Sequence, residues 1–236
     1  MSVSLGQAGS DERDYLGYDK KKEILMSYTN DLVNFSVRVT GMGPILMHKP
    51  TLVDPLHPLK KEMSKLTSKR KKTDDDLYEI ARLEWVSGLY TDEPNANEKR
   101  AWTGPYLPGR MFKAMLINAA KKSKEGPKAK SGLIVESTMN FLDYTGPKTK
   151  KELWEHGDFT DMRPEKVSQS KIMRCRPIFK EWACNVDLVF DKTILDKEDI
   201  IKFFEVGGRM LGLGDSRVGN GGDYGSFSIK EINGEN

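Results

Sequence analysis

Residues 181–190 read EWACNVDLVF and carry the clearest strand pattern in the chain. Apolar side chains recur at every second position, and the residues between them are mostly polar. Alternate side chains of a strand point to opposite faces of a sheet, so one face here is buried and the other accessible. The stretch predicts a half-buried β-strand. The apolar positions are Trp182, Cys184, Val186, Leu188 and Phe190.

The chain beyond this strand predicts a helix, a glycine-rich loop and a closing strand. Asp196 is a suitable N-cap, and Ile200, Phe203 and Phe204 follow at helical spacing. Residues 207–225 read GGRMLGLGDSRVGNGGDYG, with eight of the 21 glycines of the chain. We call this stretch the glycine run. Its glycines indicate either a tight structural turn or close approach of the backbone to phosphate groups. A short strand pattern, 224–229, follows.

The preceding half of the chain completes the order of elements. Residues 33–39 alternate strictly and predict a strand, residues 111–120 carry an apolar stripe of helical period, and residues 132–142 predict a second strand. The order is therefore strand, helix, strand, strand, helix, strand. This order predicts an α+β fold with a ferredoxin-like core, as in RNA-recognition motifs.

Two polar excursions and a terminal arm interrupt this order. Residues 1–30 predict a flexible arm, and residues 31–236 a single domain with insertions at about 44–105 and 143–170. In the first insertion, Thr73 and the acidic residues after it predict a helix start. The second insertion predicts a short helix near 150–156.

Composition favours an intracellular protein with a polyanionic partner. Of the 236 residues 37% are hydrophobic and 31% charged, and no apolar run is long enough for a membrane span. Without a signal-peptide pattern we expect a cytoplasmic protein, in which Cys175 and Cys184 are reduced core thiols. The net charge is only +3, but basic residues cluster in 60–72, 121–130 and 163–180. Such segregation of charge favours nucleic acid as the partner. The alternative is that these clusters are ordinary solvated helix faces, which have the same composition.

A set of cations and glycines forms the predicted nucleic-acid contact. Arg174 and Arg176 share one strand face, Arg38 points outward from the first strand, and the glycine run supplies bare backbone. Phe179 and Trp182 are candidates for base stacking, with a core position as the favoured alternative for Trp182. The predicted contact residues are Arg38, Lys171, Arg174, Arg176, Gly212, Gly214, Arg217, Gly221, Gly222 and Tyr224.

Two segments of the chain, residues 106–114 and 212–217, resemble segments of the RAMP superfamily. This superfamily comprises the RNA-binding subunits of CRISPR effector complexes and their relatives. YLPGRMFKA (106–114) is similar to the helix entry of that superfamily, and GLGDSR (212–217) is similar to its glycine-rich loop. Arg110-Met111 stand where the superfamily prefers small hydroxyl residues, and Ala114 stands where it prefers glycine. The resemblance implies a distant, stand-alone relative, of a type also encoded by phages that infect bacteria. It also implies copies stacked along the strand and a thumb-like second insertion.

We therefore expect a protein that binds single-stranded nucleic acid, with RNA favoured over DNA. Contacts to the backbone predict weak sequence preference, and the resemblance implies assembly as a homo-oligomer or filament. We expect no cofactor, metal or membrane partner. The first alternative is an RNA-cleaving nuclease that uses Asp54 or His57, because a histidine near a carboxylate can act as a general base. The second is an inhibitor or assembly factor that binds another protein.

Overall fold

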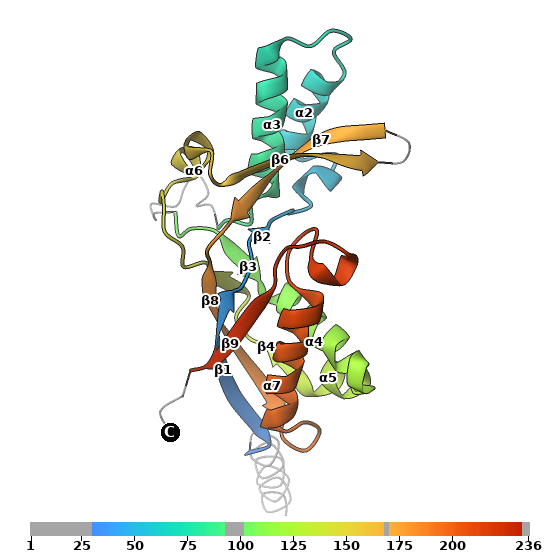
Figure 1. The fold of residues 1–236 in the computed structure, drawn as a ribbon, viewed down its shortest axis with the longest axis vertical. Helices are drawn as coiled ribbons and strands as arrows, with labels where there is room; N and C mark the ends of the chain where they lie inside the picture. The colour runs from blue at the N-terminus through green and yellow to red at the C-terminus, as the bar shows by residue number, and fades with distance from the viewer. Residues whose placement is uncertain (1–29, 93–101, 168–169, 233–236) are drawn as a thin grey trace, which may run out of the picture.

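The computed structural model describes residues 30–92, 102–167 and 170–232. Figure 1 shows an elongated molecule with two parts, which we call the core module and the upper module. The core module contains β1, β4, β8, β9, α4, α5 and α7, and the upper module contains β2, α2, α3, α6, β6 and β7. Apart from Asn30, the predicted N-terminal arm lies outside the described residues.

The core module is built on a four-stranded antiparallel sheet. Its strands are β1 (Leu32–Gly41), β4 (Leu133–Val135), β8 (Ala183–Asp191) and β9 (Phe227–Glu231), in the order β4-β8-β1-β9. Val37 pairs with Val186 at the centre of the sheet, and both are fully buried. The predicted strands at 33–39 and 182–190 are confirmed, as is the α+β class. The closing strand begins at Phe227 rather than at Tyr224, which forms only an isolated bridge with Arg217.

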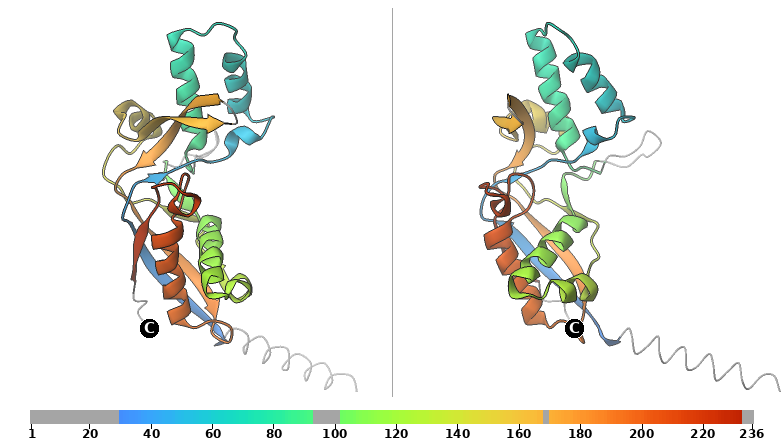
Figure 2. Two further views of the ribbon diagram at one scale, coloured as in Figure 1. Left: turned by 45° about the vertical axis from the view of Figure 1, so that its right-hand side comes forward. Right: turned by 90° about the vertical axis from the view of Figure 1, so that its right-hand side faces the viewer.

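Three helices cover one face of this sheet (Figures 1 and 2). They are α4 (Gly109–Ala120), α5 (Gly126–Gly132) and α7 (Lys197–Val206). Both α4 and α7 were predicted, and the Asp196 side chain caps α7 by accepting a hydrogen bond from the Asp199 N–H (2.8 Å). A π-helical turn, Gly207–Leu211, prolongs α7 into the glycine run. A short 3-10 turn, Lys121–Ser123, follows α4, and another, Val218–Asn220, lies within the glycine run.

The single strand predicted for residues 132–142 is wrong, because the chain forms two strands there. After β4 the chain bends, and β5 (Met139–Phe141) pairs with β3 (Tyr106–Pro108) instead of with the core sheet. The buried Asn140 side chain donates to the Leu107 carbonyl (2.9 Å), and the Gly109 N–H donates to the Thr138 carbonyl (2.9 Å). These hydrogen bonds hold the bend next to the start of α4.

The first excursion forms two helices, of which the sequence predicted one. It contains β2 (Ile45–Leu46), a 3-10 turn (Thr51–Val53), α2 (Pro58–Thr67) and α3 (Asp74–Gly88). Thr73 and Asp76 form a reciprocal capping box at the start of α3, as its sequence predicted. The helix α2 was missed because Pro50, Pro55 and Pro58 suggested extended chain. Pro58 instead occupies the first turn, where the ring is tolerated, and His57 caps it.

The second excursion forms a helix and a hairpin. The helix α6 (Lys150–His156) was predicted, whereas the pairing of β6 (Thr160–Val167) with β7 (Ser170–Phe179) was not. Hydrogen bonds join this excursion to the first: the Trp85 indole donates to the Phe159 carbonyl (2.9 Å), and the Trp154 indole donates to the Tyr78 hydroxyl (2.7 Å). Two insertions far apart in sequence therefore build one upper module (Figure 1).

The interior of the molecule contains both cysteines. Cys175 and Cys184 are buried and unpaired, as predicted.

Within the described ranges, no helix combines the length and apolar character that crossing a membrane requires.

Candidate nucleic-acid interface

The glycine run folds back on itself and against the end of β2. The Leu213 N–H donates to the Gly225 carbonyl (2.9 Å), and the Gly225 N–H donates to the Pro44 carbonyl (2.8 Å). The Asp215 N–H donates to the Leu46 carbonyl (2.8 Å). The run is therefore an ordered turn that carries the chain from α7 to the edge strand β9.

Most glycines in this turn are required by the protein's own backbone. Gly214 has a φ of +78°, and a Cβ there would collide with the Leu46 carbonyl oxygen. Gly212, Gly222 and Gly225 likewise face backbone atoms of the run itself. Gly221 differs, because its φ is +81° and no atom lies within 4 Å of where its Cβ would be. The tight-turn interpretation accounts for most of the run, and Gly221 is the predicted contact glycine with open space beside it.

A cleft of about 480 Å³ lies between α4 and the glycine run. Met111, Met115 and Leu213 supply apolar lining, and Lys121, Lys122 and Arg217 supply positive charge. No carboxylate is among the described residues that line it. The two segments that resemble the RAMP superfamily, 106–114 and 212–217, both contribute to this cleft, although about a hundred residues separate them in the chain.

The turn after Ser216 presents Arg217 to the cleft. Ser216 has a left-handed backbone (φ 45°), and Arg217 follows in extended conformation at the start of the 3-10 turn. The Arg217 carbonyl accepts hydrogen bonds from the N–H groups of Asn220 (2.9 Å) and Gly222 (3.1 Å). Within the described part of the chain no carboxylate pairs with its guanidinium, which leaves that charge available to a ligand.

Arg174 and Arg176 lie on one face of β7, as the period of two predicts, but both already have carboxylate partners. Arg174 binds Glu84 of α3 (2.9 Å), and Arg176 binds Glu165 of β6 (2.9 Å) and Asp215 of the glycine run. The Arg176 side chain is only 9% exposed. In this arrangement the two arginines hold the upper module together and join it to the run.

The remaining predicted residues lie outside the cleft lining. Tyr224 accepts a hydrogen bond from Arg163, whose guanidinium carbon lies 4.5 Å from the centre of the tyrosine ring. Arg38 lies on the open face of the core sheet, where it binds Asp143 and Asn185. Lys171 is exposed on β7. The structure thus brings Gly212, Gly214 and Arg217 to one cleft and disperses the others.

The two aromatic residues that were candidates for base stacking are buried. Phe179 is fully buried and Trp182 is 3% exposed. The Trp182 indole donates to the Gly43 carbonyl (2.9 Å), and its ring occupies the space beside Gly41. The core position favoured for Trp182 is confirmed. Neither ring is accessible to a base in this conformation.

Asp54 and His57 serve local structure. An Asp54 carboxylate oxygen accepts a hydrogen bond from the Leu56 N–H (2.9 Å), and His57 Nδ1 accepts one from the Leu59 N–H (3.2 Å) at the start of α2. A different histidine, His48, lies 3.7 Å from Asp215. Burial lowers the pKa of His48, as does the charge of Arg176. Among the described residues, no three potential ligands cluster around a possible metal position.

Sequence patterns alone did not predict that Lys121 and Lys122 line this cleft. Both belong to a basic cluster that the sequence shows, but no sequence signal places them across from Arg217. Neither protein-family models nor curated proteins yielded a match to this chain.

Proposed function

We propose that this protein binds single-stranded nucleic acid, with RNA favoured over DNA, in the cleft between α4 and the glycine run. The observation that carries the proposal is the cleft lining: Lys121, Lys122 and Arg217 face an apolar floor without an acidic residue. Phosphate groups attract such cations, and their affinity is largely independent of base sequence.

The distribution of paired and unpaired arginines supports this location. Arg38, Arg82, Arg163, Arg174 and Arg176 all form ion pairs with carboxylates. By contrast, four arginines have no ion-pair partner in the ranges that the structure describes: Arg70, Arg110, Arg209 and Arg217. Arg70 lies between α2 and α3, and the other three belong to α4 or the glycine run. Of these four, Arg217 lines the α4 cleft, and an unpaired guanidinium there suits an anionic ligand.

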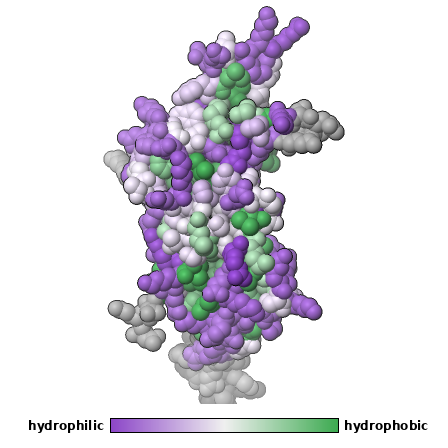
Figure 3. All heavy atoms as spheres, viewed as in Figure 1, coloured by the Kyte–Doolittle hydropathy of each residue, from purple (hydrophilic) through white to green (hydrophobic). Residues whose placement is uncertain are grey.

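The upper module offers a second basic surface. Lys60, Lys61 and Lys65 line a shallow depression of about 520 Å³ on α2. Figure 3 shows hydrophilic side chains projecting from the end formed by α2 and α3. A long strand that leaves the α4 cleft would find further positive charge there, which supports a binding site longer than one cleft.

The order of the core elements supports the finer fold assignment. In the order β4-β8-β1-β9, the first and third core strands are adjacent at the centre, and the second and fourth occupy the edges. A ferredoxin-like core has this arrangement with two helices on one face. We propose this core, and with it a distant RAMP relationship in which copies assemble along the strand.

A binding measurement tests the proposal. We expect the fluorescence anisotropy of a labelled, mixed-sequence 30-nucleotide RNA to rise when the protein is added at low salt. Binding should weaken as the salt concentration increases. DNA of the same sequence should bind less tightly than the RNA. Light scattering of the complex would then give the mass of several copies per strand. Absence of binding to both oligonucleotides at low salt would contradict the proposal.

No observation favours the nuclease or the protein-binding alternative over this function. Asp54 and His57 are engaged in a turn and a helix cap, and neither lines the α4 cleft. The same anisotropy samples, run on a denaturing gel, would reveal any cleavage of the RNA.

A further inference from the structure

A second cleft, of about 430 Å³, lies at the start of α4. Its lining includes Tyr90, Tyr106, Lys49 and Arg110. Arg110 directly precedes Met111, which lines the first cleft. Consecutive residues at the start of α4 thus contribute to both clefts.

The wall of this second cleft is aromatic. The rings of Tyr90 and Tyr106 are 6.0 Å apart at an angle of 58°, and Phe141 contacts Tyr106 edge-on, also at 6.0 Å. Tyr90 is 7% exposed, whereas Phe141 is 39% exposed and Tyr106 is half-buried. The hydroxyl groups of both tyrosines have no hydrogen-bond partner among the described residues. No described residue therefore competes with a ligand for these two hydroxyl groups.

Two cations flank these rings. Neither Lys49 nor Arg110 forms an ion pair within the described ranges, and the cleft lining there contains no carboxylate. Burial raises the pKa of Tyr106, as does the charge of Asp92, while Arg110 lowers it. The Tyr106 hydroxyl therefore stays protonated at neutral pH and remains a hydrogen-bond donor.

We propose that this second cleft receives one nucleobase of the strand whose backbone lies in the first cleft. Every base has an aromatic face that stacks on a tyrosine ring whatever the sequence. Tyrosine hydroxyls donate to base oxygens and nitrogens, and Lys49 and Arg110 attract the adjoining phosphates. The volume lies within the range of small-ligand pockets. The inference rests on the proposed function, to which it adds contact with a base.

The test compares a mixed-sequence oligonucleotide with an abasic strand of equal length and equal phosphate number. We expect the wild-type protein to bind the base-containing strand about tenfold more tightly, which corresponds to loss of a stacking contact. Tyr106→Leu keeps the apolar bulk but removes the ring, and should abolish this preference. Tyr106→Phe keeps the ring and should retain most of it. Tyr78→Leu changes a half-exposed tyrosine of α3 and is the matched control, with the preference unchanged.

The outcomes separate the two proposals. If the wild-type protein binds both strands equally, the base site is overturned while the proposed function stands. Binding of neither strand overturns both. If Tyr106→Leu does not fold, Arg110→Ser provides the second test, because this exposed side chain lines only the second cleft. Its loss should weaken binding of both strands by a similar factor, because both carry the same number of phosphates, and unchanged binding would count against the site.

Discussion

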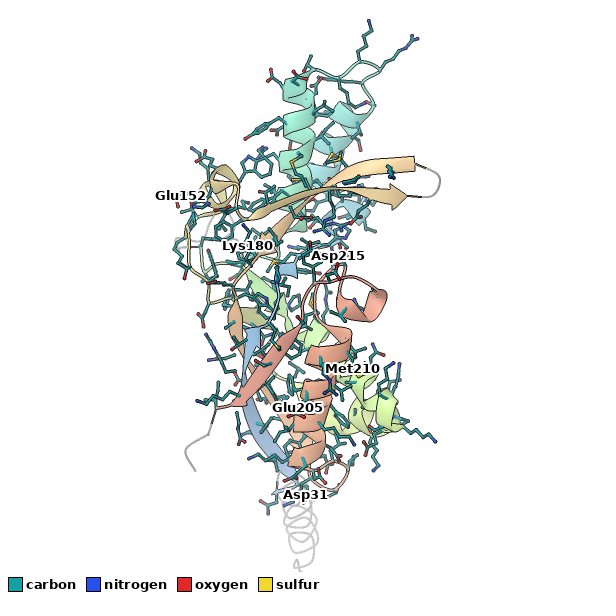
Figure 4. The ribbon with its side chains drawn as sticks, viewed as in Figure 1. Asp31, Glu152, Lys180, Glu205, Met210 and Asp215 are labelled. Carbon is teal, nitrogen blue, oxygen red and sulfur yellow. The ribbon has the colours of Figure 1, made fainter. Side chains whose placement is uncertain are left out.

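Arg176 of β7 and Asp215 of the glycine run form an ion pair that joins the upper module to the run. The same guanidinium binds Glu165 (2.9 Å), and the Asp215 backbone N–H donates to the Leu46 carbonyl (2.8 Å). Figure 4 shows Asp215 where the glycine run meets the upper module. The position of the run, and hence of the α4 cleft, therefore depends on contacts from both excursions.

Removing Arg176 should destabilise the protein more than removing Asp215. Arg176→Ala leaves two carboxylates close together without their cation, and we expect a loss of about 3 kcal/mol in the free energy of unfolding. Asp215→Ala leaves Arg176 with Glu165 and should cost about 1–2 kcal/mol. Urea unfolding measures both losses, and the double variant gives the coupling energy. Strictly additive losses would contradict a direct ion pair.

Alanine substitutions should distinguish two kinds of glycine in the run. Gly225→Ala places a methyl group against the Leu213 carbonyl oxygen, so the backbone has to move. In Gly221→Ala the added methyl group has open space around it, so only the left-handed backbone conformation lowers the free energy of unfolding, by about 1–2 kcal/mol. Chemical denaturation should show a clearly larger loss for Gly225→Ala. Equal losses would mean that the turn is looser than the structure indicates.

The basic residues of the α4 cleft should control salt dependence. Lys122→Ala and Arg217→Ala each remove one phosphate contact, so each should reduce the slope of log K against log salt by about 0.7 for a single strand. Lys151→Ala, an exposed lysine of α6 outside this cleft, is the matched control. Anisotropy titrations at several salt concentrations measure the slopes. A control variant that lowers the slope as much as the cleft variants would contradict the assigned interface.

The two buried thiols should make the protein less stable at alkaline pH. Burial raises the pKa of Cys175 and of Cys184 to about 12, from an ordinary value of 9.0. Between these values the unfolded state loses the thiol protons and the folded state keeps them, so stability falls as pH rises. Each thiol contributes a slope of at most about 1.4 kcal/mol per pH unit.

Urea unfolding between pH 8 and 11 measures this slope. The variant with both Cys175→Ala and Cys184→Ala should have a shallower pH dependence, although it is less stable overall. In the folded wild-type protein at pH 8, a thiol reagent such as Ellman's should react far more slowly than with the unfolded chain. Rapid reaction of either cysteine would show that its burial is transient.

Local patterns predicted much of the core module and the start of α3 in the upper module. The alternation in 33–39 and 182–190 reflects one buried sheet face, and the caps at Thr73 and Asp196 reflect hydrogen bonds within one helical turn. The sequence predicts these elements because the alternation and the capping hydrogen bonds involve residues only a few positions apart. The bend at Asn140 depends on the Leu107 carbonyl, 33 residues away in the chain, so no local pattern shows it. The hairpin of β6 with β7 is local, but β6 (TDMRPEKV) is mostly polar and contains a proline, so its sequence does not indicate a strand.

For the candidate site, the sequence by itself determined the residue types: a glycine-dense run, clusters of basic residues and a helix entry that resembles a known superfamily. Only the tertiary structure decided their roles. It places Lys122 and Arg217 in one cleft, and it pairs Arg174 and Arg176 with Glu84, Glu165 and Asp215. The physical reason is that the availability of a charge depends on which carboxylates fold against it, and these lie up to 90 residues away along the chain.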